Sequence, residues 1–302
     1  MSATVTPTSN TPKTTPTTYA TNPGRRHFWL RRLHSLAGIL FGGYIVVHLT
    51  VNATAISPRA FQQNVDKIHG LEPMLPLIEV LTIFAPLLLH MIYGIYISFA
   101  GVKFNTTKYN YGGNLRYTLQ RWTAVILLLF LVLHIGTLHK WGFAALHSFT
   151  HVEFFKNYGD LFQPHNQAYQ STVGGIRHLI NHENPWHPGN VAVMGFYLLG
   201  VWSAAFHFAN GLWTSAIAWG LTVTASAQKR WGHFCLGLGA MLLVVGTVAW
   251  AAFTIHPNAA GDLGRWDEVT RTQSHDSPVH EQSEGIVKDK AIEKLTAPAT
   301  QP

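Results

Sequence analysis

The segment VAVMGFYLLGVWSAAFHFANGLWTSAI, residues 191–217, contains no Asp, Glu, Lys or Arg. A helix needs about 20 apolar residues to cross the hydrocarbon core of a bilayer, so this segment is long enough to span a membrane. Four further stretches also lack charged residues: 33–58, 80–102, 122–139 and 231–261. We therefore predict an all-α integral membrane protein with five transmembrane helices in a bundle, at about 33–53, 76–100, 120–140, 190–217 and 232–255.

The composition of the whole chain agrees with a membrane location. Charged residues make up 12% of the 302 residues, against about 25% in an average soluble protein. Residues 1–24 are rich in Thr and Pro and are predicted to be a disordered tail, and residues 258–302 form a polar C-terminal tail. The membrane domain is therefore expected at 25–257. The single cysteine, Cys235, excludes intrachain disulfides and Cys-ligated iron–sulfur clusters, so a metal cofactor here would need His ligands.

Basic residues are distributed unequally between the two ends of the predicted bundle. The N-terminal segment, the 101–121 loop and residues 229–230 hold eleven Lys and Arg and no acid, whereas the other two loops hold five basic and six acidic residues. Short cytoplasmic loops carry the excess of Lys and Arg, so the N-terminus is expected in the cytoplasm and the C-terminus outside. The basic clusters alternate with apolar spans and do not gather on one face, which indicates membrane lipid and not nucleic acid as the partner.

Four of the predicted spans carry a histidine in their interior: His48, His90, His134 and His207. With a rise of about 1.5 Å per residue, His48 and His134 fall in the outer half of the membrane, and His90 and His207 fall in the inner half. Ionisable residues inside a membrane are usually functional. Two histidines that face each other at one depth suit the axial ligation of a b-type haem, so two haems are the favoured interpretation. A single haem or a proton or ion pathway are the alternatives.

Three glycines lie near the inner histidines in sequence. Gly94 follows His90 by four residues, and Gly200 and Gly211 share a helix face with His207. A glycine beside a ligand lets a flat macrocycle approach the backbone, so all three are candidate cofactor-binding residues. Simple packing of helices is the alternative, because glycine is common at transmembrane helix interfaces.

Polar residues at the two membrane surfaces are further candidates. At the cytoplasmic end, Arg32, His34 and Ser35 are candidates for contact with the propionates of the inner haem or for a quinone pocket. At the outer end, Glu79 is a candidate for proton transfer near a quinone, as carboxylates at a membrane edge can have shifted pKa values. A hydrated carboxylate at the interface is the alternative for Glu79.

Four motifs carry a resemblance to a known family: RRLHSLAGILFGGYIVVHLTVN (31–52), LIEVLTIFAPLLLHMIYGIYISF (77–99), LQRWTAVILLLFLVLHI (119–135) and GFYLLGVWSAAFHFANGLWTSAIAWGLTVT (195–224). The chain resembles, over about residues 26–255, the diheme cytochrome b558 membrane-anchor subunits of succinate dehydrogenase and fumarate reductase, the single-anchor type with five helices. This resemblance implies two haem b groups, the outer on His48 and His134 and the inner on His90 and His207. It also implies a cytoplasmic iron–sulfur subunit and a flavoprotein subunit as partners, and a quinone of the menaquinone type as acceptor in the bacterial cytoplasmic membrane.

The resemblance leaves several points open. A cytochrome b anchor of fumarate reductase, hydrogenase or formate dehydrogenase would share the haem chemistry, and a haem-free transporter that uses the histidines is a further alternative. The 141–189 loop is much longer than in compact members of the family and contains six of the histidines. Of these, His147 and His151 have the spacing to share a metal on a helix, but no HExxH motif or Cys accompanies them. A surface cap over the outer haem is the favoured interpretation of this loop.

Overall fold

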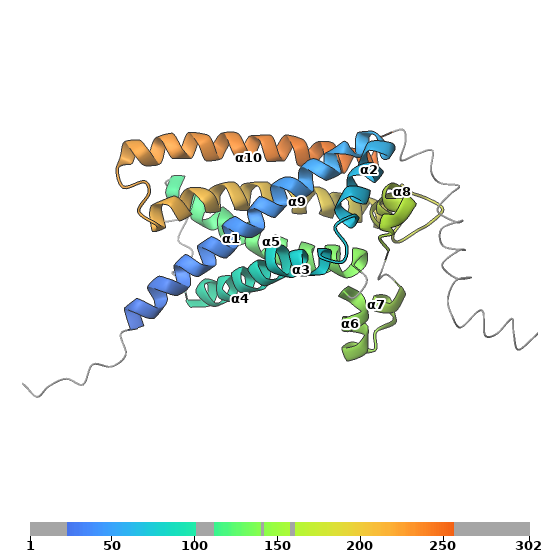
Figure 1. Cartoon of the computed structure of the whole chain (residues 1–302), viewed down its shortest axis with the longest axis horizontal. Helices are drawn as coiled ribbons and strands as arrows, with labels where there is room; N and C mark the ends of the chain where they lie inside the picture. The colour runs from blue at the N-terminus through green and yellow to red at the C-terminus, as the bar shows by residue number, and fades with distance from the viewer. Residues whose placement is uncertain (1–22, 101–111, 140–141, 158–160, 257–302) are drawn as a thin grey trace, which may run out of the picture.

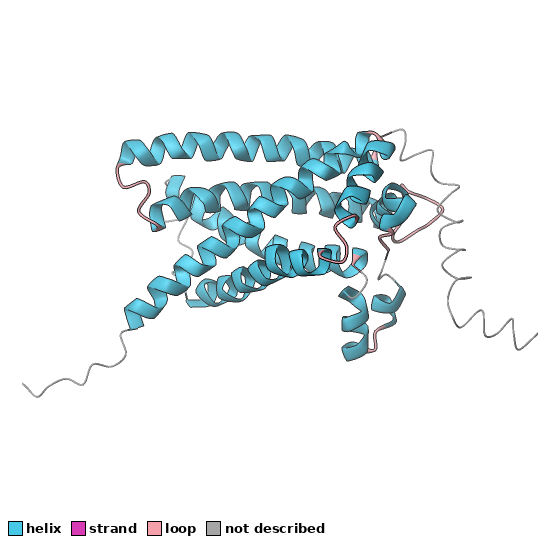
Figure 2. Cartoon of the chain, in the orientation of Figure 1, coloured by secondary structure: helices cyan, strands magenta, loops and turns pink. Residues whose placement is uncertain are grey.

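Five long helices form the body of the molecule in the computed structural model, which describes residues 23–100, 112–139, 142–157 and 161–256 (Figure 1). The helices are α1 (Pro23–Ala53), α2 (Pro58–His69), α3 (Leu75–Glu79), α4 (Ala85–Ala100), α5 (Gly112–Leu138), α6 (Gly142–Thr150), α7 (Glu153–Asn157), α8 (Pro164–Arg177), α9 (Pro188–Ala218) and α10 (Ala225–Thr254). A 3₁₀ turn (Thr54–Ile56) follows α1, and a π-helical turn (Val80–Phe84) joins α3 to α4. Within the described residues there is no strand (Figure 2).

Five helical segments are long and apolar enough to cross a membrane: His27–Ile56, Leu75–Ser98, Asn114–Leu138, Pro188–Ala218 and Ala225–Thr254. Their outward faces carry large apolar side chains, among them Ile92 at 64% exposure and Leu236 at 70%. Such apolar exposure along a whole helix suits contact with lipid and not with water. The predicted all-α fold with five spans is confirmed, and the chain is a multi-pass integral membrane protein.

Most helices extend beyond the predicted spans. α1 starts at Pro23, so two residues of the segment expected to be disordered are helical, and α5 and α10 start eight and seven residues before the predicted positions 120 and 232. Hydropathy marks the part of a helix inside lipid, whereas backbone hydrogen bonding continues it through the polar interface. At α10 the helix begins where the Thr224 hydroxyl accepts a hydrogen bond from the Ala227 N–H, as expected of an N-cap. Residues 1–22 and 257–302, which make up nearly all of the two predicted tails, lie outside the described residues.

The bundle is organised around α9, which packs against α1, α5 and α10, while α1 also packs against α4 (Figure 1). The helices α2 and α8 pack on each other at one end of the bundle, and α8 also contacts α9 and α10. At that end the buried phenol of Tyr169 on α8 donates a hydrogen bond of 2.9 Å to the carbonyl of Ala252 on α10. The described part of the long loop predicted at 141–189 therefore contains three short helices, and one of them, α8, covers an end of the bundle.

Candidate haem-binding site

The first pair of candidate ligands joins α1 to α5. The imidazole centroids of His48 and His134 lie 5.9 Å apart with an angle of 83° between the ring planes. Nδ1 of His48 is 3.2 Å from the hydroxyl of Tyr44, one helical turn earlier. The ring of Phe130 stacks on His134 at 5.3 Å, and Tyr197 from α9 meets His134 edge-on at 5.7 Å. Aromatic neighbours therefore hold this pair between three helices.

The second pair joins α4 to α9. The centroids of His90 and His207 are 6.1 Å apart with an interplanar angle of 82°, nearly the same arrangement as in the first pair. Nδ1 of His90 is 3.0 Å from the carbonyl oxygen of His34, and Nδ1 of His207 is 3.2 Å from the hydroxyl of Thr123. The structure thus brings together the same two pairs that the sequence places at equal depths.

The hydrogen bonds at these rings bear on what the histidines can bind. A carbonyl oxygen only accepts hydrogen bonds, so Nδ1 of His90 must carry the proton, and the neutral ring keeps its lone pair on Nε2. A hydroxyl at Nδ1 can hold His48 and His207 in the same tautomer. Metal-bound histidines usually donate their second N–H in this way, which fixes the ring and raises its basicity. The donor set therefore fits iron held axially by two imidazoles, as in a b-type haem.

The spacing between the two pairs follows from α1. His34 stacks on His90 of the second pair with a centroid distance of 4.0 Å, and His48 of the first pair lies fourteen residues further along α1. Gly38, ten residues before His48, also faces the His90 ring, so at about 1.5 Å per residue the pairs are about 15–21 Å apart along this helix. The two pairs therefore lie at different levels along the bundle.

The three candidates expected at the inner surface lie in the first half of α1. The ring of His34 contacts His90, whereas the hydroxyl of Ser35 accepts a hydrogen bond of 3.2 Å from the indole N–H of Trp219. The guanidinium of Arg32 lies 5.1 Å from the ring of the same Trp219, and its Nε is buried without a hydrogen-bond partner among the described residues. Of the three, His34 contacts a candidate ligand, whereas Arg32 and Ser35 both contact Trp219.

Glu79 is connected to the first pair through Tyr44. The Glu79 carboxylate interacts electrostatically with Tyr44, and the Tyr44 hydroxyl contacts His48. Glu79 is also the last residue before the π-helical turn Val80–Phe84. Such turns occur frequently at functional sites because they redirect side chains within a helix. Tyr44 therefore stands between Glu79 and one histidine of the first pair.

The glycines differ in what they face. A Cβ at Gly200 would overlap the ring of Phe130, a Cβ at Gly94 would lie 3.2 Å from His34, and a Cβ at Gly211 would lie 3.6 Å from the Gln120 side chain. Sequence reasoning missed Gly38, where a Cβ would lie 2.6 Å from two atoms of the His90 ring. The signal was available, because Gly38 follows His34 by one helical turn and His34 was already a candidate.

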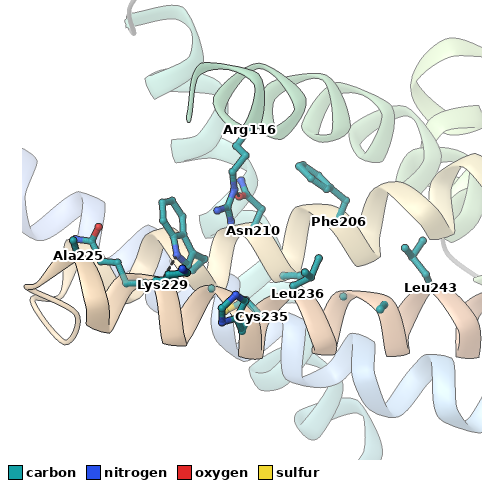
Figure 3. A pocket seen from close by; sticks show the side chains of 15 residues that line it. Arg116, Phe206, Asn210, Ala225, Lys229, Cys235, Leu236 and Leu243 are labelled. Carbon is teal, nitrogen blue, oxygen red and sulfur yellow. Dashed lines mark hydrogen bonds between the residues drawn. The ribbon is translucent and has the colours of Figure 1, made fainter. Parts of the chain in front are cut away.

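Two cavities lie among the long helices in the described part of the chain. One of about 240 Å³ is bordered by Thr137, Phe196 and Tyr197, next to His134. A larger one of about 710 Å³ lies between α5, α9 and α10, with Arg116 and Lys229 at one part of its wall and Phe206, Leu236 and Leu243 along the rest (Figure 3). A chain of hydrogen bonds leads from this cavity to the inner pair, since Arg116 donates to Asn210, Asn210 donates to Gln120, and Gln120 donates to the carbonyl of His207.

No family model matches this chain. The chain is 33% identical over 232 residues to the succinate dehydrogenase cytochrome b558 subunit of Bacillus subtilis (strain 168), and the alignment covers 98% of that protein and 76% of this chain. This chain belongs to the succinate dehydrogenase cytochrome b558 subunits. The name of the relative, a cytochrome b, indicates haem b as the cofactor.

Membership in this family favours succinate dehydrogenase among the respiratory enzymes whose cytochrome b anchors were considered from the sequence. The relative is a subunit of succinate dehydrogenase, and not of a hydrogenase or a formate dehydrogenase. This cytochrome b558 subunit is longer than its relative, because about a quarter of its residues lie outside the alignment.

Proposed function

We propose that this cytochrome b558 subunit binds two b haems, the outer one on His48 and His134 and the inner one on His90 and His207. The observation that carries the proposal is the presence of two histidine pairs with matched ring separations of 5.9 and 6.1 Å on four different transmembrane helices. A haem supplies a one-electron redox centre when it is bound. Two such centres, one in each half of the membrane, would give electrons a path from one side of the membrane to the other.

The residues of this chain hold and tune the ligands. Tyr44 and Thr123 each contact Nδ1 of one ligand, and the carbonyl of His34 accepts from a third. These contacts fix the orientation of the rings before the iron is bound. On the cytoplasmic side we place an iron–sulfur subunit and a flavoprotein subunit of succinate dehydrogenase, which deliver the electrons. No dicarboxylate chemistry is assigned to this chain.

The acceptor is a membrane quinone, for which we propose the menaquinone type. Two regions suit it: the outer one at Glu79 and Tyr44, and the inner one at Arg32, His34 and Ser35. At the outer region Glu79 is the group to transfer protons to the quinone. Replacement of Glu79 by Gln and of Arg32 by Gln in separate complexes distinguishes the regions, because only the variant at the true site should lower succinate:quinone activity while both haems remain.

Haem quantification on the purified complex tests the central proposal. We expect two b haems per chain, one haem fewer in His134→Ala, and the other haem lost in His207→Ala. Reduced-minus-oxidised spectra then show which of the two absorption components remains in each variant. One haem per chain in the unmodified complex, or loss of both haems from either replacement with an intact bundle, would refute the assignment of pairs.

A further inference from the structure

Three side chains outside the haem region meet where α2 and α8 pack together: His69 at the end of α2, Glu72 in the following turn, and His165 in the first turn of α8. One ligand atom from each lies within 4.8 Å of the others. The rings of His69 and His165 have centroids 5.5 Å apart, and Nδ1 of His69 is 3.6 Å from a carboxylate oxygen of Glu72. Residues almost a hundred positions apart in the sequence thus present two nitrogens and one oxygen to one point.

The side chain of Gln62 fixes this meeting point. Its amide NH₂ donates to the carbonyl of Pro164 at 2.7 Å, and its amide oxygen accepts from the N–H of Ala168 at 2.9 Å. Gln62 precedes His69 by seven residues, or two helical turns, so both lie on the same face of α2. His165 directly follows Pro164 and is therefore carried to the face of α2 that holds His69. The position of the three residues is set by the packing of backbone and buried side chains, independently of any ion.

The hydrogen bonding of the cluster is incomplete. Nδ1 of His69 is buried and has no hydrogen-bond partner among the described residues. The 3.6 Å to Glu72 is an ion-pair distance and is too long for a hydrogen bond. Buried polar atoms normally have a partner, and a bound metal ion can be that partner for an imidazole nitrogen.

We propose that His69, Glu72 and His165 bind a divalent cation such as Zn²⁺, which links α8 to α2. Two imidazoles and one carboxylate form a known ligand set for Zn²⁺, with water or an external ligand in the fourth position. The site is open to solvent, since the Glu72 side chain is 59% exposed. Bound cations of this kind link elements that are distant in sequence and stabilise the folded arrangement.

The cation would stabilise the end of the bundle that carries the first histidine pair. Buried residues of α2 and α8, such as Phe61 and Tyr169, belong to one apolar cluster with Phe130 and Tyr197. The rings of Phe130 and Tyr197 both contact His134. A cation that joins α2 to α8 would therefore stabilise the packing of these two helices on the residues that surround His134.

The test uses the intact succinate dehydrogenase complex in detergent, freed of metals with EDTA and dialysed against Zn²⁺. Zinc is measured by mass spectrometry and divided by the amount of chain from amino-acid analysis. We expect one zinc per chain in the unmodified complex and a loss of affinity of about tenfold or more in H165Q and E72Q, since even residues behind the ligands change metal affinity by about 10–100-fold. The thermal unfolding temperature should rise with Zn²⁺ in the unmodified complex and remain constant in H165Q.

The matched control is H147Q. His147 lies in the same long loop, with His151 at a ring distance of 6.3 Å and Glu153 at 3.9 Å, but it is not part of the three-residue cluster. H147Q should keep the zinc and its effect on unfolding, and the haem spectrum of each variant reports whether the bundle is intact. Equal zinc affinity in H165Q and the unmodified complex, or an equal loss in H147Q, would overturn the proposal. Because zinc is counted per chain and not per haem, this result is independent of the number of haems.

Discussion

The contact between Thr123 and His207 gives a direct test of how the two histidine pairs are arranged. Thr123→Val keeps the shape of the side chain but removes the oxygen 3.2 Å from Nδ1 of His207. Without this partner the imidazole is a weaker electron donor to iron, so the oxidised haem is less stabilised and its reduction potential should rise. The inner haem alone should respond, because His48 and His134 do not contact Thr123.

The size of the shift follows from the worth of one hydrogen bond. Such a bond contributes about 0.5–1.5 kcal/mol net, and for one electron a tenfold change in equilibrium constant, about 1.4 kcal/mol, equals about 59 mV. The full loss would thus shift the potential by roughly 20–60 mV. This range is an upper bound, since only the difference between the two oxidation states counts.

Redox titration of the purified complex, followed by haem absorbance, measures both potentials in one experiment. Tyr44→Phe is the matched variant at the other pair, because it removes the hydroxyl that lies 3.2 Å from Nδ1 of His48. We expect Thr123→Val to raise one potential and Tyr44→Phe to raise the other. If both variants shift the same haem, or if Thr123→Val shifts both equally, the pairing of His90 with His207 is wrong.

Three further predictions concern packing and protonation. Gly38→Ala places a Cβ 2.6 Å from the His90 ring and should weaken or abolish binding of the inner haem, whereas Gly43→Ala, with nothing within 4 Å, should leave both haem spectra unchanged. Asn190→Ala removes a buried amide with four hydrogen bonds and should lower the thermal unfolding temperature, at a cost of about 1–3 kcal/mol for each buried group left without a partner. Burial lowers the pKa of His178 at the end of α8 below its usual 6.5, so the folded state binds fewer protons than the unfolded state. Stability should therefore fall as the pH drops below 6.5, and His178→Gln should flatten this dependence in thermal unfolding measured across pH.

The sequence was a good guide to the site wherever one helix could be considered by itself. The rise per residue is constant in a helix, so the depths of His48 and His134 could be calculated and their meeting expected. The same reasoning placed His34 at the inner surface. It did not show that His34 stacks on His90, because that contact depends on how α1 and α4 are rotated against each other.

The number of spans and the helical class were determined by the sequence alone. The physical reason is that lipid offers no hydrogen-bond partners, so a charge-free stretch of sufficient length can cross it only as a helix. The tertiary structure alone decided which glycine lies against a ligand, how α8 covers one end of the bundle, and that His69, Glu72 and His165 meet. These features depend on contacts between segments that are distant in the sequence. Side chains such as Gln62 set those contacts by their packing, and no local sequence pattern predicts them.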